Sequence, residues 1–362
     1  MIAQTGNIFP MGPTKAYGGE RIIFYLCEEL HRLGHEVVFF GTAQNEVPTG
    51  VEHVVTMPID AVEYDPHTPA VRRWEQAHGR KFDVFQCNYF GNKWDERAVE
   101  DWPYCELVWC SWCHTFDQLG GAFNTVSYSR TLQAEMKRTR RQTSMIHYGI
   151  PMGRYAVSDE PPLPYVVWIG KIEGGKGLEW AIDCAKAAGV RIVVMGPPYS
   201  SGHMQRAILP RIHDPAVVWL RGATDSMKAR VFARATAFLS ANVDGWTEAF
   251  GIVNIEALAS GCPVIGWTRD GEQASAVLID GVIQEGVNGY LMRYRSSANQ
   301  DEWAHVVQEV GTLIQKCAKL NRQKVRESVV ERFGAERMAR RWLWFYEEVR
   351  TKRRVTSVEI PF

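Results

Sequence analysis

Two glutamates stand eight positions apart around a glycine. Between Glu248 and Glu256, Phe250-Gly251-Ile252 predicts a tight turn that opens a helix, because apolar residues then recur at helical spacing. A helix N-terminus presents backbone N–H groups and the positive end of its dipole, which favour a phosphate. Carboxylates on either side of that phosphate can accept hydrogen bonds from sugar hydroxyls. The stretch predicts a nucleoside diphosphate sugar site, unless Glu248 is only a solvated loop residue and Glu256 a helix surface residue.

The elements around these residues predict a domain with a parallel sheet and helices. Gly261 and Pro263 end the predicted helix, and a buried strand follows over 264–266. A strand over 165–170 leads into a loop that carries Lys171 and Lys176, ahead of a helix over 178–188. Apolar runs predict further strands over 191–196, 217–220, 237–240 and 288–292.

The first half of the sequence predicts a second parallel sheet. A strand over 1–10, a loop with Gly18 and Gly19, an apolar helical stripe over 22–33 and a strand over 35–41 form a βαβ unit. Residues 42–80, which contain four prolines, are expected to be irregular. Strands are expected over 82–87, 106–114 and 122–126, with His114 at the exit of the second of these. Pro151 and the proline-rich stretch 159–164 indicate the linker.

Length and composition indicate a two-domain protein. The 362 residues suit two domains of about 150–200 residues each. The net charge is zero, but residues 1–162 carry 15 Lys and Arg against 20 Asp and Glu, and the remainder carries 26 against 21. An anion therefore suits the second half better, and the acidic first half disfavours nucleic acid. With no signal sequence and no run near the roughly 18 apolar residues of a spanning helix, we expect a cytoplasmic protein whose eight cysteines are reduced.

Motifs along almost the whole chain resemble glycosyltransferase family 4, which comprises retaining enzymes of the GT-B fold. The matching stretches are Tyr17-Gly-Gly-Glu-Arg21, Gly34-His-Glu-Val37, His147-Tyr-Gly-Ile-Pro151, Ile169-Gly-Lys171 with Lys176-Gly177, the Glu248 to Pro263 block, Asp280-Gly-Val282 with Gly286-Val-Asn-Gly289, and Arg332-Phe-Gly-Ala-Glu-Arg337. The two-glutamate block and the lysine block are specific as a pair, whereas the N-terminal glycine loop is a weaker match.

The resemblance implies an α/β protein with two facing Rossmann-like domains and parallel sheets. Residues 1–158 would form the acceptor-binding domain and residues 159–340 the domain that binds the nucleotide sugar. Residues 341–362 would form a C-terminal helix and tail that cross back to the first domain.

The same resemblance implies roles for individual residues. Glu248 would bind hydroxyls of the sugar, Glu256 those of the ribose, and Lys171 and Lys176 would neutralise the diphosphate. His114 matches a histidine near the reacting sugar carbon, where it would orient the sugar. The remaining donor-binding positions are Gly18, Gly19, Gly170, Gly196, Ala249, Phe250, Gly251, Ile252 and Val253.

Two positions depart from the family pattern. Lys171 stands where the family usually has arginine, so a compact ammonium charge replaces the planar guanidinium group. Tyr148 stands where asparagine or histidine is commoner, which makes the turn between the domains unusual. Neither departure argues against the predicted reaction.

The predicted reaction transfers a glycosyl group from a nucleoside diphosphate to a hydroxyl of a glycan, a lipid or a small molecule. Two lysines and a helix N-terminus would stabilise the departing diphosphate. We therefore expect no cofactor and no metal ion, and the sequence has no Asp-x-Asp cluster. The basic stretch 137–141 is a solvated face or a contact for an anionic acceptor or membrane surface.

Several other functions remain open from the sequence. An epimerase or hydrolase of the same fold, or a non-catalytic nucleotide-sugar sensor, would use the same donor residues. The Cys110 to His114 stretch has the spacing of a c-type haem attachment site, and with Cys105 it suggests a zinc site, but strand alternation points Cys110 and Cys113 to opposite faces. A dinucleotide oxidoreductase is disfavoured, since no Gly-x-Gly-x-x-Gly opens a helix with an acidic residue about 20 positions later.

Overall fold

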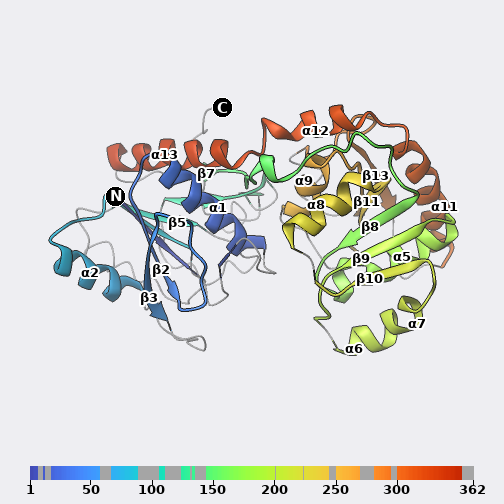
Figure 1. Cartoon of the computed structure of the whole chain (residues 1–362), viewed down its shortest axis with the longest axis horizontal. Coiled ribbons are helices and arrows are strands. Elements are labelled where there is room, and N and C mark those ends of the chain that lie inside the picture. The colour runs from blue at the N-terminus through green and yellow to red at the C-terminus, as the bar shows by residue number, and fades with distance from the viewer. Residues whose placement is uncertain are drawn as a thin grey trace. The chain divides into compact units, whose positions relative to one another are not determined.

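The computed structural model forms two units. It describes residues 1–6, 11–12, 18–57, 67–88, 106–110, 124–130, 133–134, 144–199, 201–222, 224–243, 250–269, 281–294 and 300–352. The first unit comprises Met1–Ile150 and Phe333–Phe362, and the second comprises Pro151–Arg332 (Figure 1). These boundaries differ from the predicted ones, at 158/159 and 340/341. The proline-rich stretch 159–164 belongs to the second unit, where Leu163 N donates to Arg234 O at 2.7 Å.

The first unit contains a parallel sheet in the strand order β3-β2-β1-β4-β5-β6-β7. Its elements are β1 (Ile2–Thr5), α1 (Gly18–Arg32), β2 (Val37–Thr42), β3 (Glu52–Met57), α2 (His67–His78), β4 (Val84–Cys87), β5 (Glu106–Cys110), β6 (Thr125–Ser127), β7 (Ser144–Met145) and α13 (Ala335–Lys352). The order changes direction between β1 and β4, as in a Rossmann fold.

The prediction that residues 42–80 are irregular was wrong. They contain strand β3 and helix α2. Pro69 is the third residue of α2, where a backbone N–H has no intrahelical partner and proline is tolerated. Ala70, Val71 and Trp74 lie on the buried face of this helix. A prediction based on the number of prolines therefore missed a short amphipathic helix.

The second unit contains a parallel sheet in the order β10-β9-β8-β11-β12-β13 (Figure 1). Its strands are β8 (Tyr165–Ile169), β9 (Arg191–Met195), β10 (Val217–Leu220), β11 (Ala237–Ser240), β12 (Val264–Arg269) and β13 (Gly289–Tyr294). Its helical elements are η1 (Met152–Arg154), η2 (Gly174–Lys176), α5 (Leu178–Ala187), α6 (Ser201–His203), the π-helical segment η3 (Met204–Ile208), α7 (Leu209–Ile212), α8 (Asp225–Arg234), α9 (Ile252–Ala259), α11 (Gln300–Cys317) and α12 (Arg322–Val330). All six strands were expected from their apolar runs.

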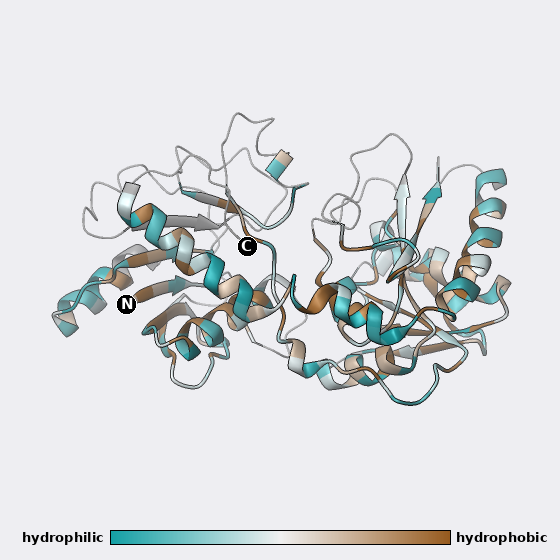
Figure 2. Ribbon diagram, turned by 90° about the horizontal axis from the view of Figure 1, so that it is seen from above, coloured by the Kyte–Doolittle hydropathy of each residue, from teal (hydrophilic) through white to brown (hydrophobic). Residues whose placement is uncertain are grey.

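Each unit is stabilised by burial of the apolar face of its helices against its sheet. In Figure 2 the strands are mostly hydrophobic, whereas the helices carry a hydrophilic face along one side. Cysteines contribute to this interior as buried thiols at Cys27, Cys87, Cys184, Cys262 and Cys317. Burial raises the pKa of both Cys184 and Cys262 to about 12. These two thiols are therefore core residues and not nucleophiles.

Helix α13 returns to the first unit, where it packs against α1 and β5. It begins at Ala335, six residues before the predicted position, and its Tyr346 enters a buried polar network. The Gln4 amide Nε2 donates to Tyr346 Oη and to Gln86 Oε1, both at 3.1 Å. Asn88 Nδ2 donates to Gln4 Oε1 at 3.0 Å, and Tyr346 also donates to Gln86. Since Gln4 and Gln86 are fully buried, their amides depend on these partners.

We expect Tyr346→Phe to destabilise the protein by about 1–3 kcal/mol, because it removes a partner of two buried amides. The free energy of unfolding in urea would measure this loss. Tyr199→Phe is the matched control, since Tyr199 is 61% exposed. Equal stability of the Tyr346→Phe protein and the control would contradict a stabilising role for the network.

Candidate functional site

The site begins at the point where the strand order of the second unit changes direction. Strands β8 and β11 are neighbours there, although one comes first along the chain and the other fourth. Because all the strands are parallel, the segments that follow them emerge at the same edge of the sheet. Val243 N, after β11, donates to Gly175 O, after β8, at 3.2 Å. Ligands of open α/β sheets bind in the crevice at such a switch point.

The loop after β8 carries the two predicted lysines. Lys176 lies in η2, and its backbone carbonyl accepts a hydrogen bond from the Trp168 indole Nε1 at 3.0 Å. Gly177 follows in a left-handed conformation, with φ 60° and ψ 36°. A Cβ at this position would lie 1.9 Å from Ala241 O, so the loop rests directly on the backbone after β11. Gly177 therefore permits the contact that brings the two segments together.

Lys171 lies at the exit of β8, where its Nζ is 4.8 Å from the centre of the Tyr199 ring. This cation–π contact directs the ammonium toward the segment after β9. Gly170 and Gly196 have a structural task at the same edge, because a Cβ on Gly196 would lie 1.9 Å from Gly170 O. Gly196 thus allows the exits of β8 and β9 to pack closely, whereas a Cβ on Gly170 would lie 3.1 Å from the Trp168 ring of β8.

Helix α9 supplies the predicted N-terminus. Gly251 is its N-cap, with φ 70° and ψ 66°, and no side chain caps the helix. Phe250 is 1% exposed, and Ile252 and Val253 are the first residues of the helix. The first N–H groups of a helix have no intrahelical partners and favour an anion. Gly261, with φ 71°, follows the C-cap, which confirms the predicted end of the helix.

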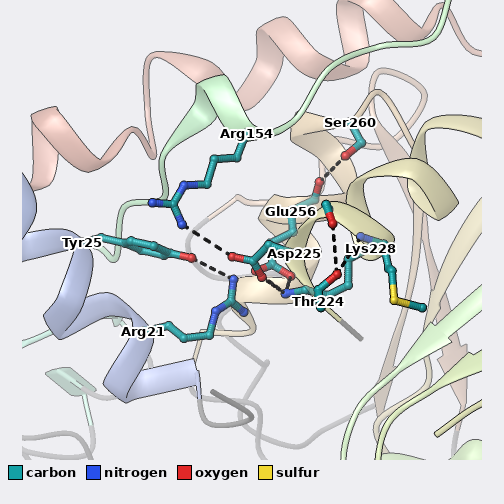
Figure 3. A network of polar contacts seen from close by, with 10 residues as sticks. Arg21, Tyr25, Arg154, Thr224, Asp225, Lys228, Glu256 and Ser260 are labelled. Atoms are coloured by element: carbon teal, nitrogen blue, oxygen red, sulfur yellow. Dashed lines mark hydrogen bonds and ion pairs between the residues drawn. The ribbon is translucent and has the colours of Figure 1, made fainter. Parts of the chain in front are cut away.

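Glu256 forms a buried ion pair that the sequence analysis missed. Lys228 Nζ, on α8, lies 3.0 Å from Glu256 Oε1 and 2.9 Å from Oε2 (Figure 3). Its distance to Asp225 Oδ1 is also 2.9 Å. The side chains of Lys228 and Glu256 are only 7% and 1% exposed. Loss of one partner of such a pair leaves a buried charge uncompensated, at a cost of about 3–5 kcal/mol.

A sequence signal for Lys228 did exist. Lys228 and Phe232 stand four residues apart, and they are the two buried residues of α8. A lysine on the apolar stripe of an amphipathic helix requires a partner, since lysines are rarely buried unpaired. The partner is 28 residues away in the sequence, so spacing within the helix did not reveal it.

The remaining predicted residues are not part of this geometry. His114, Glu248 and Ala249 lie outside the described residues, and so does the basic stretch 137–141. Gly18 and Gly19 belong to the first unit, where they are the first two residues of α1 and not part of the loop before it. The other predicted residues all lie in the second unit, and they are Gly170, Lys171, Lys176, Gly196, Phe250, Gly251, Ile252, Val253 and Glu256.

Two properties of the described residues bear on the chemistry. Within them, no group of three or more His, Cys, Asp and Glu side chains is placed to bind a metal ion. None of the helices in that part of the chain is long and apolar enough to cross a membrane. Among the described residues, Lys171 and Lys176 follow β8, and the N-terminus of α9 follows β11, its neighbour at the switch point.

The sequence of the second unit matches a known family. Residues 163–314 match the family model described as glycosyl transferases group 1. A D-inositol 3-phosphate glycosyltransferase from Mycobacterium marinum is 29% identical over 160 residues, which are 42% of this chain and 32% of that protein. The matched segments cover 32% to 44% of the length of the curated relatives.

Solved structures resemble the whole fold. AviGT4, a glycosyltransferase involved in avilamycin A biosynthesis, superposes with a TM-score of 0.71 at 19% identity, covering 97% of this chain and 98% of that one. Anabaena HepE in complex with UDP-glucose gives 0.66 at 15% identity, with 97% and 99% covered. Both superpositions cover almost the whole chain, which has two Rossmann-like units with parallel sheets. The chain has the GT-B fold, and its residues 163–314 match the model of glycosyl transferases group 1.

Proposed function

We propose that this protein is a retaining glycosyltransferase that moves a sugar from a nucleoside diphosphate sugar to an acceptor hydroxyl without a metal ion. The observation that carries the proposal is the packing of the Lys171–Gly177 loop beside the backbone after β11, at the switch point of the second sheet. The next helix along the chain after β11 is α9, and its N-terminus has no side-chain cap. This combination suits a diphosphate flanked by hydroxyls.

The described residues would act on the leaving group. As the bond between the sugar carbon and the phosphate oxygen breaks, negative charge grows on the diphosphate. Lys171, Lys176 and the first N–H groups of α9 would stabilise that charge electrostatically. The acceptor oxygen then bonds to the sugar carbon on the same face, and its proton passes to the departing phosphate oxygen.

The relatives support the donor class. The solved HepE complex holds UDP-glucose, and one curated relative, the GtfA subunit from Streptococcus gordonii, is named for a reaction of UDP-N-acetylglucosamine. The M. marinum relative is named for a phosphorylated polyol acceptor. We infer a nucleotide sugar as donor and a hydroxyl compound as acceptor, with Glu248 on the sugar and His114 near its reacting carbon.

A donor panel tests this function. UDP-, GDP-, ADP- and TDP-sugars are scored first by thermal shift and then by nucleotide release, with and without EDTA. We expect one donor at 100 times its Kd to stabilise the protein by about 2.7 kcal/mol. Release of its nucleotide should require an acceptor and should persist in EDTA. Strict metal dependence would contradict the lysine mechanism, and release of free sugar without an acceptor would indicate a hydrolase instead.

A further inference from the structure

Lys228 occupies an electrostatically unfavourable place in its helix. It lies in the first turn of α8, where the positive end of the helix dipole repels a cation. Its ammonium is nevertheless almost fully buried and contacts three carboxylate oxygens, two of Glu256 and one of Asp225. Three donors of an ammonium thus match three acceptors. The arrangement indicates that the role of Lys228 is to hold the carboxylate of Glu256.

The geometry fixes the carboxylate of Glu256. Contacts of 3.0 and 2.9 Å from one ammonium nitrogen to both oxygens hold the open end of the carboxylate toward Lys228. Asp225 prevents the ammonium from moving along α8, and Asp225 Oδ2 lies 3.8 Å from Arg154 Nη1 (Figure 3). Helices α8 and α9 both begin after strands that end at the same edge of the sheet, the edge of the candidate site.

We propose that Lys228 is a positioning residue that orients Glu256 toward the ribose of the donor, and that this pair makes the protein prefer ribonucleotides to 2′-deoxyribonucleotides. The proposal rests on the proposed function and on the expectation, from the sequence resemblance, that Glu256 binds the ribose. A carboxylate accepts up to about four hydrogen bonds, so Glu256 can receive the Lys228 ammonium and a sugar hydroxyl together. A charge-assisted hydrogen bond to a 2′-hydroxyl is directional, and its strength depends on the orientation of the carboxylate.

Binding of nucleoside diphosphates tests the proposal independently of turnover. Calorimetric Kd values are measured for UDP, GDP and ADP, each beside its 2′-deoxy form. We expect the wild type to bind the ribo form of its preferred nucleotide about 10- to 100-fold more tightly than the deoxy form. Lys228→Met should weaken the ribo form and bring the two Kd values to within about 3-fold. Lys228→Arg, which keeps the charge, should restore part of the preference.

Two further variants keep the proposal falsifiable. Lys186→Met is the matched control, because it removes a lysine that pairs with Asp214 at 2.7 Å on the surface of the same unit, and its ribose preference should equal that of the wild type. If Lys228→Met fails to fold, the double variant Lys228→Met/Glu256→Gln removes both buried charges and should also lose the preference. A folded variant of either kind that keeps the wild-type ratio would overturn the proposal, since a purely structural pair would weaken both nucleotide forms alike.

The outcomes separate this proposal from the proposed function. A wild type that prefers the ribo form, loses the preference with Lys228→Met and transfers no sugar would overturn only the glycosyltransferase function. A protein that transfers sugar and has a ribose preference independent of Lys228 would overturn only the role of Lys228. Absence of nucleotide binding by the wild type would overturn both.

Discussion

Replacing Lys176 by alanine is expected to lower kcat by about 10²- to 10³-fold, as does the loss of one group that stabilises transition-state charge in other enzymes. The backbone carbonyl of Lys176 accepts the Trp168 indole hydrogen bond, and alanine retains that carbonyl. The fold should therefore survive the substitution. Steady-state kinetics with the preferred donor, together with a thermal unfolding curve, would measure both expectations.

Lys186→Ala provides the control for the loss of a lysine. Lys186 lies on α5, which is the helix that directly follows the Lys176 loop, and its side chain is 40% exposed. We expect its kcat to equal that of the wild type. A Lys176→Ala protein as active as this control would show that the diphosphate does not bind at the loop after β8.

Replacing Gly177 by alanine is expected to affect both stability and turnover. The left-handed backbone would strain an alanine, and its Cβ would lie 1.9 Å from Ala241 O and 3.0 Å from Val243 Cγ1. Strain and overpacking together should lower the free energy of unfolding by roughly 2–4 kcal/mol. Since the loop must move away from the backbone after β11, kcat should fall as well. Urea unfolding and steady-state kinetics would measure the two effects.

Gly189→Ala separates the strain from the clash. Gly189 also has a positive φ, of 66°, but a Cβ there would meet no atom within 4 Å. We expect a loss of about 1 kcal/mol from backbone strain alone, with unchanged kcat. Equal losses at the two glycines would mean that the contact between the loop and Ala241 is not tight in solution.

The sequence predicted the strands of the second unit well because each of them is a short apolar run, although the edge strand β10 is only partly buried. Runs such as Val217–Leu220 and Ala237–Ser240 are uniformly suited to strands, and their predicted bounds agree with the structure. The glycine and proline residues that end α9 gave an equally direct signal. In the first unit, the four prolines predict irregular structure over 42–80. Pro69, however, lies in the first turn of a helix, where proline is tolerated.

The candidate site was predictable only as far as local sequence carries it. Local sequence was enough to predict the lysines in the loop after β8 and the N-terminus of α9 in the segment after β11. The Lys228–Glu256 pair depends on how α8 packs beside α9, which neither helix determines alone. The same reason applies to Tyr346, whose partners Gln4 and Gln86 lie more than 250 residues away.

The connections between the units have a consequence for synthesis on the ribosome. The second unit is one continuous insertion, because Ile150 N donates to Phe333 O and Ala335 N donates to Ile150 O, both at 2.9 Å. Every residue of the inserted unit is translated before α13, so the first sheet lacks this covering helix until α13 has emerged. The domain that starts first must therefore finish last, and the nascent chain carries an incompletely covered sheet while the insertion folds.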